Sequence, residues 1–322
     1  MSEILRTLLI VFGVLIGMLT LAAGLIWVER RLLGLWQDRY GPNRVGPFGL
    51  FQVLADMIKI FTKEDWIPPF ADKAVFIVAP AVIMVTVLLS FAIIPFSPEI
   101  WVADLNIGLL FFLGMSSLAV YSTALGGWAS SSKYSLIGGM RATAQLISYE
   151  VFMGLSLMGV VVQAGSFRLI DIVEAQRGLW FCIPQFVGLM VFTVAALAEG
   201  KRLPFDLPEA EAELVGGYHT EYSGMKFGMF FVGEYLGIAL MAAVMTVLFF
   251  GGWLGPVLPG PVWFLLKMMV LVALIILARA SLPRPRYDQL MGFGWKAMLP
   301  LALLNLVVTG AVVLLTSAGG GS

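Results

Sequence analysis

Apolar residues are gathered into eight long runs, and polar segments separate each run from the next. Each run has about the 20 residues that an α-helix needs to cross a bilayer, which is longer than a typical strand. The runs lie near residues 5–28, 74–95, 105–126, 145–163, 180–198, 229–250, 262–280 and 297–316. The pattern predicts an all-α integral membrane protein. Residues 1–322 would form a single membrane domain, a bundle of about eight transmembrane helices, with a flexible tail over residues 317–322.

The composition supports this and excludes several kinds of chemistry. Of 322 residues, 60% are hydrophobic and 12% are charged, whereas soluble domains are about half apolar and a quarter charged. One cysteine, Cys182, and one histidine, His219, cannot build an iron–sulfur, zinc or bis-histidine haem site. We therefore expect no metal and no redox centre in this chain. The net charge is zero and no phosphate-binding glycine motif is present, so neither nucleic acid nor a bound nucleotide is expected.

Basic residues are distributed unequally between the two sides of the predicted bundle. The even connections hold only Arg168 and Arg177. The odd connections hold the others between the predicted spans: Arg30, Arg31, Arg39, Arg44, Lys59, Lys63, Lys73, Lys133, Arg141, Lys201, Arg202, Lys226, Arg284, Arg286 and Lys296. By the positive-inside rule, the odd connections face the cytoplasm and both termini lie on the outer side. The function is therefore expected on the cytoplasmic face.

The first cytoplasmic segment, residues 29–73, contains a predicted amphipathic helix near residues 50–61. Its apolar stripe would be Phe51, Leu54, Ile58 and Phe61, and a polar stripe would hold Gln52, Asp56, Lys59 and Lys63. This pattern is typical of a helix that lies at the membrane interface, where it could frame a lateral opening for a lipid-soluble substrate. Alternatively, it only packs the loop down, and Arg30 and Arg31 are ordinary cations at the end of a span.

The fifth connection, residues 199–228, is densely acidic at its start, with Glu199, Asp206, Glu209, Glu211 and Glu213 within fifteen residues. Helix capping accounts for acids near a helix start. Glu209 and Glu213 are four residues apart, where two negative charges repel each other. One hypothesis is that mutually raised carboxylate pKa values make the cluster a proton relay. Capping alone is the alternative.

Charged residues also fall inside predicted spans. Glu150, Glu199 and Glu234 lie in or at the ends of spans, and Lys267 is the cation farthest from a span end. Burying a charge at mid-bilayer costs roughly 2.5–3.5 kcal/mol or more, so these groups must be neutral, hydrated or paired. We expect either a hydrated acidic line leading into the bundle, or a Glu–Lys pair with glutamates that reach cytoplasmic water.

Several motifs together resemble subunit 1 of respiratory complex I, which is called the H subunit in the bacterial enzyme. Residues 29–31 with 41–44 look like the opening of that family, and residues 49–64 and 204–214 resemble its two signature stretches. The similarity continues through residues 133–150, 221–227 and 279–288. It covers nearly the whole chain. One departure is at residues 198–202, Ala-Glu-Gly-Lys-Arg, where many relatives have Thr-Asn between the Glu and the Arg.

The resemblance implies a subunit of a proton-translocating NADH:quinone oxidoreductase. It implies a chamber for quinone, expected to be ubiquinone, at Glu29, Arg30, Arg31, Asp56, Lys59, Arg202 and Asp206. It also implies a proton-coupling route through Glu150, Glu199, Glu209, Glu211, Glu213, Glu221 and Glu234.

The remaining implications concern the surroundings of the chain. Iron–sulfur clusters, FMN and NADH would reside on partner subunits. The partners would be hydrophilic subunits on the cytoplasmic face, other membrane subunits and lipid. The location would be the bacterial inner membrane, with both termini periplasmic. The alternatives are the related membrane subunit of a proton-coupled hydrogenase, a proton-coupled secondary transporter and an inert membrane anchor.

Overall fold

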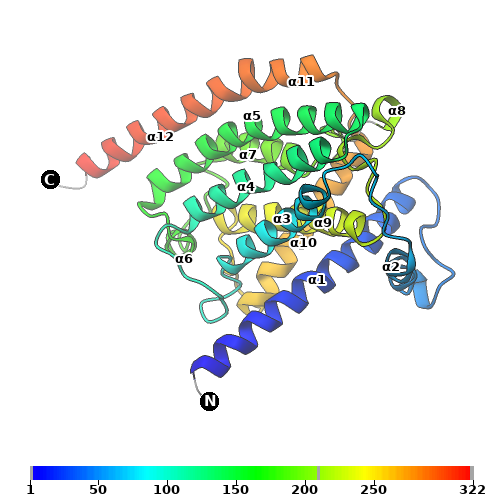
Figure 1. Cartoon of the computed structure of the whole chain (residues 1–322). Coiled ribbons are helices and arrows are strands. Elements are labelled where there is room, and N and C mark those ends of the chain that lie inside the picture. The colour runs from blue at the N-terminus through cyan, green and yellow to red at the C-terminus, as the bar shows by residue number, and fades with distance from the viewer. Residues whose placement is uncertain (1–2, 209–210, 320–322) are drawn as a thin grey trace.

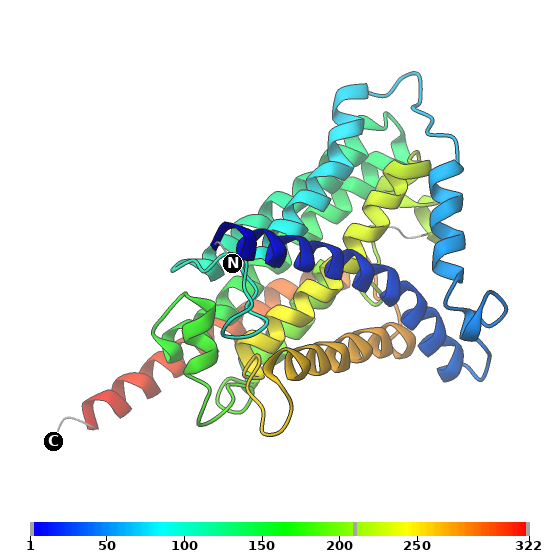
Figure 2. The ribbon, with the colours of Figure 1, turned by 90° about the horizontal axis from the view of Figure 1, so that it is seen from below.

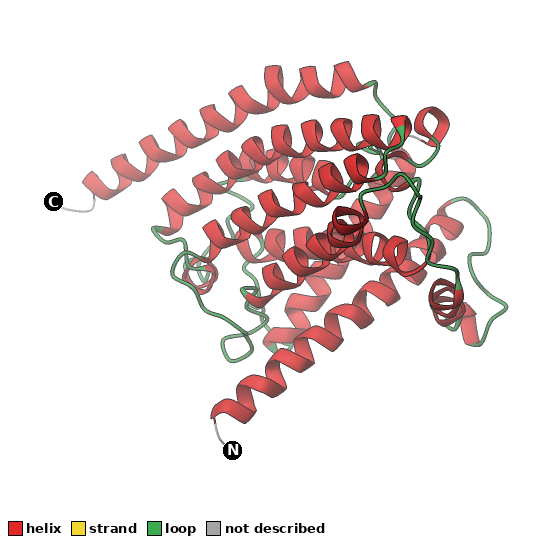
Figure 3. Cartoon of the chain, in the orientation of Figure 1, coloured by secondary structure: helices red, strands yellow, loops and turns green. Residues whose placement is uncertain are grey.

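The computed structural model describes residues 3–208 and 211–319, and within these ranges it contains helices and loops but no strand (Figures 1 and 3). The helices are α1 (Glu3–Trp36), η1 (Pro47–Gly49), α2 (Gln52–Thr62), α3 (Lys73–Ala92), α4 (Gly108–Ala129), α5 (Lys133–Ala164), α6 (Leu169–Glu174), α7 (Phe186–Glu199), α8 (Glu211–Leu214), η2 (Gly217–His219), α9 (Gly224–Phe249), α10 (Gly260–Ser281), α11 (Tyr287–Phe293), η3 (Gly294–Met298) and α12 (Leu299–Gly319).

Seven helical stretches in the described part of the chain are long and apolar enough to cross a membrane: α1, α3, α4, α5, α9, α10 and the continuous stretch Tyr287–Thr316. The predicted all-α membrane bundle is therefore confirmed. The remaining predicted span, at residues 180–198, corresponds to α7, which has only 14 residues. At 1.5 Å per residue, α7 by itself covers about 21 Å of a hydrocarbon core of about 30 Å, and turns at residues 181–185 lead into it.

Helix α9 forms the centre of the bundle. It is apolar on all sides and buried along most of its length, as expected of a helix surrounded by others. Helices α1, α3, α7 and α10 all contact it. On the periphery, α12 runs beside α5 and α7 (Figure 1) and exposes its outer apolar face.

Two helices extend beyond their apolar runs. Helix α1 continues through Glu29, Arg30 and Arg31 to Trp36, and α5 begins at Lys133, so that Arg141 is helical. The predicted ends of these helices were wrong, because hydropathy stops at the first charges whereas backbone hydrogen bonding continues past them. The last helix continues through residues 317–319 of the predicted tail, and residues 320–322 lie outside the described part.

The loop that follows α7 enters the bundle. Glu199, at the end of α7, accepts a hydrogen bond from Ser116, which lies near the middle of α4. Lys201, Arg202, Phe205 and Leu207 are all buried. Gln145 of α5 donates to the carbonyls of Ala198 and Phe205, at 2.9 Å each. Non-helical backbone is tolerated at membrane depth when protein satisfies it in this way. The sequence predicts that this stretch is a cytoplasmic loop, whereas in the structure the start of the stretch lies inside the bundle.

The predicted amphipathic helix is present as α2, which lies beside the C-terminal end of α1 (Figure 2). Ile60 packs where Gly228 of α9 has no side chain, because a Cβ there would lie 2.8 Å from Ile60. The predicted apolar stripe, Phe51, Leu54, Ile58 and Phe61, is exposed. Helix α2 is therefore docked by one flank and presents its apolar stripe outward.

Candidate functional site

The first group of charged residues joins α1 to α2. Arg30 donates to Asp56 at 2.5 Å, Gln52 donates to the same carboxylate at 3.2 Å, and the Lys59 Nζ lies 3.9 Å from it. The Lys59 side chain is 73% exposed. Three of the predicted chamber residues are therefore in contact, because the turn of residues 37–51 folds α2 back against the end of α1.

Two further predicted chamber residues have structural partners. Glu29 is 3% exposed and forms an ion pair with Arg279 near the end of α10. Arg31 donates to the carbonyl of Pro42 at 3.3 Å. These contacts fix the C-terminal end of α1 against α10 and against its own following loop.

A second group surrounds Glu234 in α9. Its carboxylate accepts a 2.6 Å hydrogen bond from the hydroxyl of Tyr218 and lies 3.8 Å from Arg202. The Lys201 Nζ lies over the ring of Tyr218, and the Arg202 guanidinium lies over the ring of Tyr235. Glu234 and Arg202 are both buried. The loop that enters the bundle therefore supplies the cations that face the carboxylate of α9.

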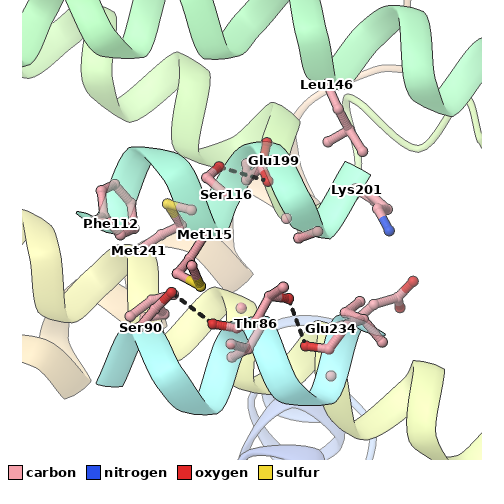
Figure 4. A pocket seen from close by; sticks show the side chains of 17 residues that line it. Thr86, Ser90, Phe112, Met115, Ser116, Leu146, Glu199, Lys201, Glu234 and Met241 are labelled. Carbon is pink, nitrogen blue, oxygen red and sulfur yellow. Dashed lines mark hydrogen bonds between the residues drawn. The ribbon is translucent and has the colours of Figure 1, made fainter. Parts of the chain in front are cut away.

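A cavity of about 50 Å³ lies between α3, α4, α7 and α9, and both Glu199 and Glu234 line it (Figure 4). Glu199 and Ser116 lie on one side, and Thr86 and Ser90 of α3 lie on the other (Figure 4). Ser116 donates to Glu199 at 3.3 Å. The structure thus brings two predicted proton-coupling carboxylates to a single cavity.

Glu150 in α5 accepts a 2.5 Å hydrogen bond from Ser117 of α4. It lines an open hollow of about 420 Å³ with Leu113, Ile147, Val151, Gly154 and Leu155. Glu150 and Glu199 are thus hydrogen-bonded to adjacent residues of α4, Ser117 and Ser116. Glu150 therefore continues the line from the cavity to the outer surface of the bundle.

The two groups of charged residues are also linked. Helix α1, which carries Arg30, packs against α9, which carries Tyr235, and the Arg202 guanidinium lies over the ring of Tyr235. We name one series of groups the charged line. Its members, in order, are Asp56, Arg30, Tyr235, Arg202, Glu234, the cavity, Glu199 and Glu150.

Other predicted residues lie outside the charged line. Arg284 donates to the backbone carbonyl of Asp206. Glu221 lies half-buried in the loop before α9. Glu211 begins α8, and Glu209 lies outside the described residues.

The surroundings of Glu213 contradict the hypothesis that the carboxylates of the acidic segment raise one another's pKa values. Arg141 of α5 donates to its carboxylate at 2.7 Å. This hydrogen bond, with the positive charge of Arg141, holds the pKa of the Glu213 carboxyl below its usual range. Glu213 is therefore ionised near neutral pH, and the ion pair fastens the acidic segment to α5.

This pairing predicts a pH-independent role for Glu213 between about pH 6 and pH 8, well above the usual glutamate pKa of about 4.3. A lowered folded-state pKa stabilises the fold above the unfolded-state pKa, and that stability is lost only as the pH falls through the folded-state value. We expect Glu213→Gln in the assembled complex to leave the shape of the pH profile of quinone turnover unchanged in this window. A new or missing apparent pKa there would contradict the assignment.

Among the residues that the structure describes, Lys267 pairs with backbone carbonyls and with no glutamate, so the alternative of a Glu–Lys pair is wrong. Its Nζ donates to the carbonyls of Phe250, Gly252 and Leu254, at 2.7, 3.0 and 2.6 Å. It also lies 4.4 Å from the centre of the Trp180 ring. All three of its N–H donors are thus engaged with one loop.

Lys267→Met is expected to destabilise the complex by about 3 kcal/mol, because it leaves three carbonyls without their charged donor. Turnover per intact complex should be unchanged. The measurements are the melting temperature in detergent and the specific activity after purification. An intact, stable complex with slow turnover would instead assign Lys267 to the chemistry.

Sequence reasoning missed the hydroxyl groups along the charged line. Ser116, Ser117 and Tyr218 each donate to one of its carboxylates, and Thr86 and Ser90 line the cavity. Only Ser116 and Ser117 come close to being recognisable from the sequence, because they are adjacent polar residues within an apolar run. Which carboxylate each faces depends on helix packing.

The fold and the charged line define a multi-pass membrane protein with ionisable groups arranged in series inside its bundle. The chain belongs to the NADH dehydrogenase family, whose family model matches residues 9–310. One relative, the H subunit of the NADH-quinone oxidoreductase of Methylococcus capsulatus, is 66% identical over 304 residues, which cover 94% of this chain and 96% of the relative. The predicted family resemblance, and the expectation that the chain is part of an oxidoreductase, are confirmed.

Proposed function

We propose that the chain forms the membrane half of the quinone chamber of NADH:quinone oxidoreductase and the start of its proton-coupling route. The observation that carries the proposal is the charged line, whose members extend from the interfacial helix α2 to carboxylates inside the bundle. A membrane anchor has no need for such a series, because buried charges are costly.

The chemistry follows from what quinone reduction requires. A quinone that accepts two electrons from a partner's iron–sulfur cluster also takes up two protons to become a quinol. Negative charge develops on its oxygens before the protons arrive, and Arg30, Arg31 and Lys59 supply cations near α2 that stabilise it. The change in charge reaches Glu234 through Arg202, and the carboxylates redistribute protons in response.

Helix α2 gives the chamber its connection to lipid. Its exposed apolar stripe, with Leu50 and Met57 beside it, suits contact with the acyl region of the cytoplasmic leaflet. Asp56 of the polar stripe faces Arg30 instead. A quinone, ubiquinone in this proposal, would therefore leave the bilayer beside α2 and meet the cations of the charged line.

Partner subunits would cover two faces of the chain. The hollow at Glu150 is open and apolar apart from its carboxylate, so another membrane subunit would cover it and continue the line. Hydrophilic subunits carrying iron–sulfur clusters, FMN and the NADH site would cover the cytoplasmic face. The surface that these subunits cover would include Glu209, Glu211, Glu213 and Glu221. Both termini would lie on the periplasmic side of the inner membrane, in keeping with the distribution of basic residues.

The test is photolabelling of the assembled complex in its membrane with a photoreactive quinone analogue. We expect labels within residues 29–63, which are reduced by excess unlabelled quinone. Labels confined to other subunits would overturn the chamber assignment. A liposome assay separates the rival class, because a secondary transporter would drive solute uptake as a purified single chain.

A further inference from the structure

The cavity of the charged line raises the question of how a proton crosses between its two carboxylates. Glu199 is hydrogen-bonded to Ser116, and Glu234 to Tyr218, so each carboxylate is held on its own side. A volume of about 50 Å³ has room for about three to five water molecules at roughly 10–15 Å³ each. The space between the carboxylates therefore has the right size for a short chain of water.

Two hydroxyls of α3 supply the polar partners that such water needs. Thr86 donates to the carbonyl of Val82 at 2.9 Å, and Ser90 donates to that of Thr86 at 2.8 Å. Because each hydroxyl hydrogen is engaged within the helix, the oxygen lone pairs remain as acceptors. Both residues line the cavity (Figure 4). Water held by these acceptors has its own lone pairs available for a proton in transit.

Gly237 of α9 also lines the cavity, and packing does not explain it. A Cβ at Gly237 would meet nothing within 4 Å, whereas a Cβ at Gly233, one turn earlier, would lie 3.0 Å from Ile83. Glycine within a helix costs about 1 kcal/mol relative to alanine. Gly233 is thus needed for the approach of α3, whereas Gly237 keeps a space that protein atoms do not fill.

We propose that Gly237 is a positioning residue for proton transfer. By having no side chain, it keeps room for ordered water between Glu199 and Glu234, and the hydroxyls of Thr86 and Ser90 hold that water. This inference rests on the proposed proton-coupling function of the charged line. It adds what the carboxylates alone do not explain, which is why the wall between them contains a glycine and two hydroxyls.

The test compares Gly237→Ala with Gly237→Ser in the assembled complex. The two side chains are similar in size, but only serine offers a hydroxyl in place of the displaced water. We expect Gly237→Ala to lower NADH:quinone turnover about tenfold, since misplacing a reacting group by 1 Å can cost roughly 100-fold. It should also increase the solvent deuterium isotope effect. Gly237→Ser should stay within about twofold of wild type, because its hydroxyl can relay hydrogen bonds.

Gly310→Ala is the matched control. Gly310 is also helical and half-buried, and a Cβ there also meets nothing within 4 Å, but it lies in α12 away from the cavity. It should keep wild-type turnover. NADH oxidation with a water-soluble electron acceptor should be unchanged in all three variants, which shows that the partner subunits are intact, and purification of the variant chain together with those subunits shows that the complex has assembled.

Two outcomes would overturn the inference: wild-type turnover in Gly237→Ala, or equal losses in Gly237→Ala and Gly237→Ser, which would indicate a purely steric effect. The variant Glu234→Gln separates this inference from the proposed function. If Glu234→Gln is slow while Gly237→Ala is normal, only the role of Gly237 fails. If Glu234→Gln is also normal, the proton-coupling function fails with it.

Discussion

Glu234→Gln is expected to lower NADH:quinone turnover of the assembled complex by about a hundredfold, the lower end of the range for loss of a proton-transferring group. Glutamine has nearly the same size and can still accept the hydrogen bond that Tyr218 donates at 2.6 Å. It cannot take up a proton, and it gives Arg202 a neutral neighbour instead of a carboxylate 3.8 Å away. The measurements are turnover and acidification across sealed membrane vesicles.

The control for this prediction is Glu174→Gln. Glu174, at the end of α6, forms an ion pair with the exposed Arg177, and neither residue belongs to the charged line. Surface pairs of this kind contribute about 0–1 kcal/mol, so turnover and stability should match wild type. Wild-type turnover and acidification in Glu234→Gln would remove Glu234 from the proton route and leave it as a structural partner of Tyr218 and Arg202.

Arg279→Met is expected to destabilise the complex by about 3–5 kcal/mol, because it leaves the buried carboxylate of Glu29 without its partner. Glu29 is 3% exposed, so water cannot take the place of Arg279. The effect should appear as a lower melting temperature and as loss of assembled complex from the membrane. The C-terminal end of α1, which carries Arg30 and Arg31, would then be held less firmly against α10.

A double variant separates stability from function here. Replacing both partners, as in Glu29→Leu with Arg279→Met, removes the unpaired charge and should recover most of the lost stability. Arg30→Met breaks an ion pair whose arginine side chain is 43% exposed, and its effect on stability should stay below about 1 kcal/mol. If Arg279→Met melts like wild type, the pair with Glu29 contributes nothing to the docking of α1.

The sequence by itself determined that this protein folds in a lipid bilayer. Its long apolar runs leave only helices as an option, since every backbone group in lipid must be satisfied within its own segment. The interfacial helix α2 was also predictable, because its apolar and polar stripes repeat at helical spacing within eleven residues. The candidate charges could be found in the same way, since ionisable residues are conspicuous in apolar runs.

Only the tertiary structure decided how those charges are paired. Lys267 looked like the partner of a glutamate, but it binds three carbonyls of one loop. Glu213 looked like part of a proton relay, but Arg141, distant in sequence, keeps it ionised. The short helix α7 delivers Glu199 to the middle of the bundle. Helical periodicity shows which residues lie on the same face of one helix. The partner of a charged side chain depends instead on which helices pack together. Contacts between residues distant in sequence leave no local pattern.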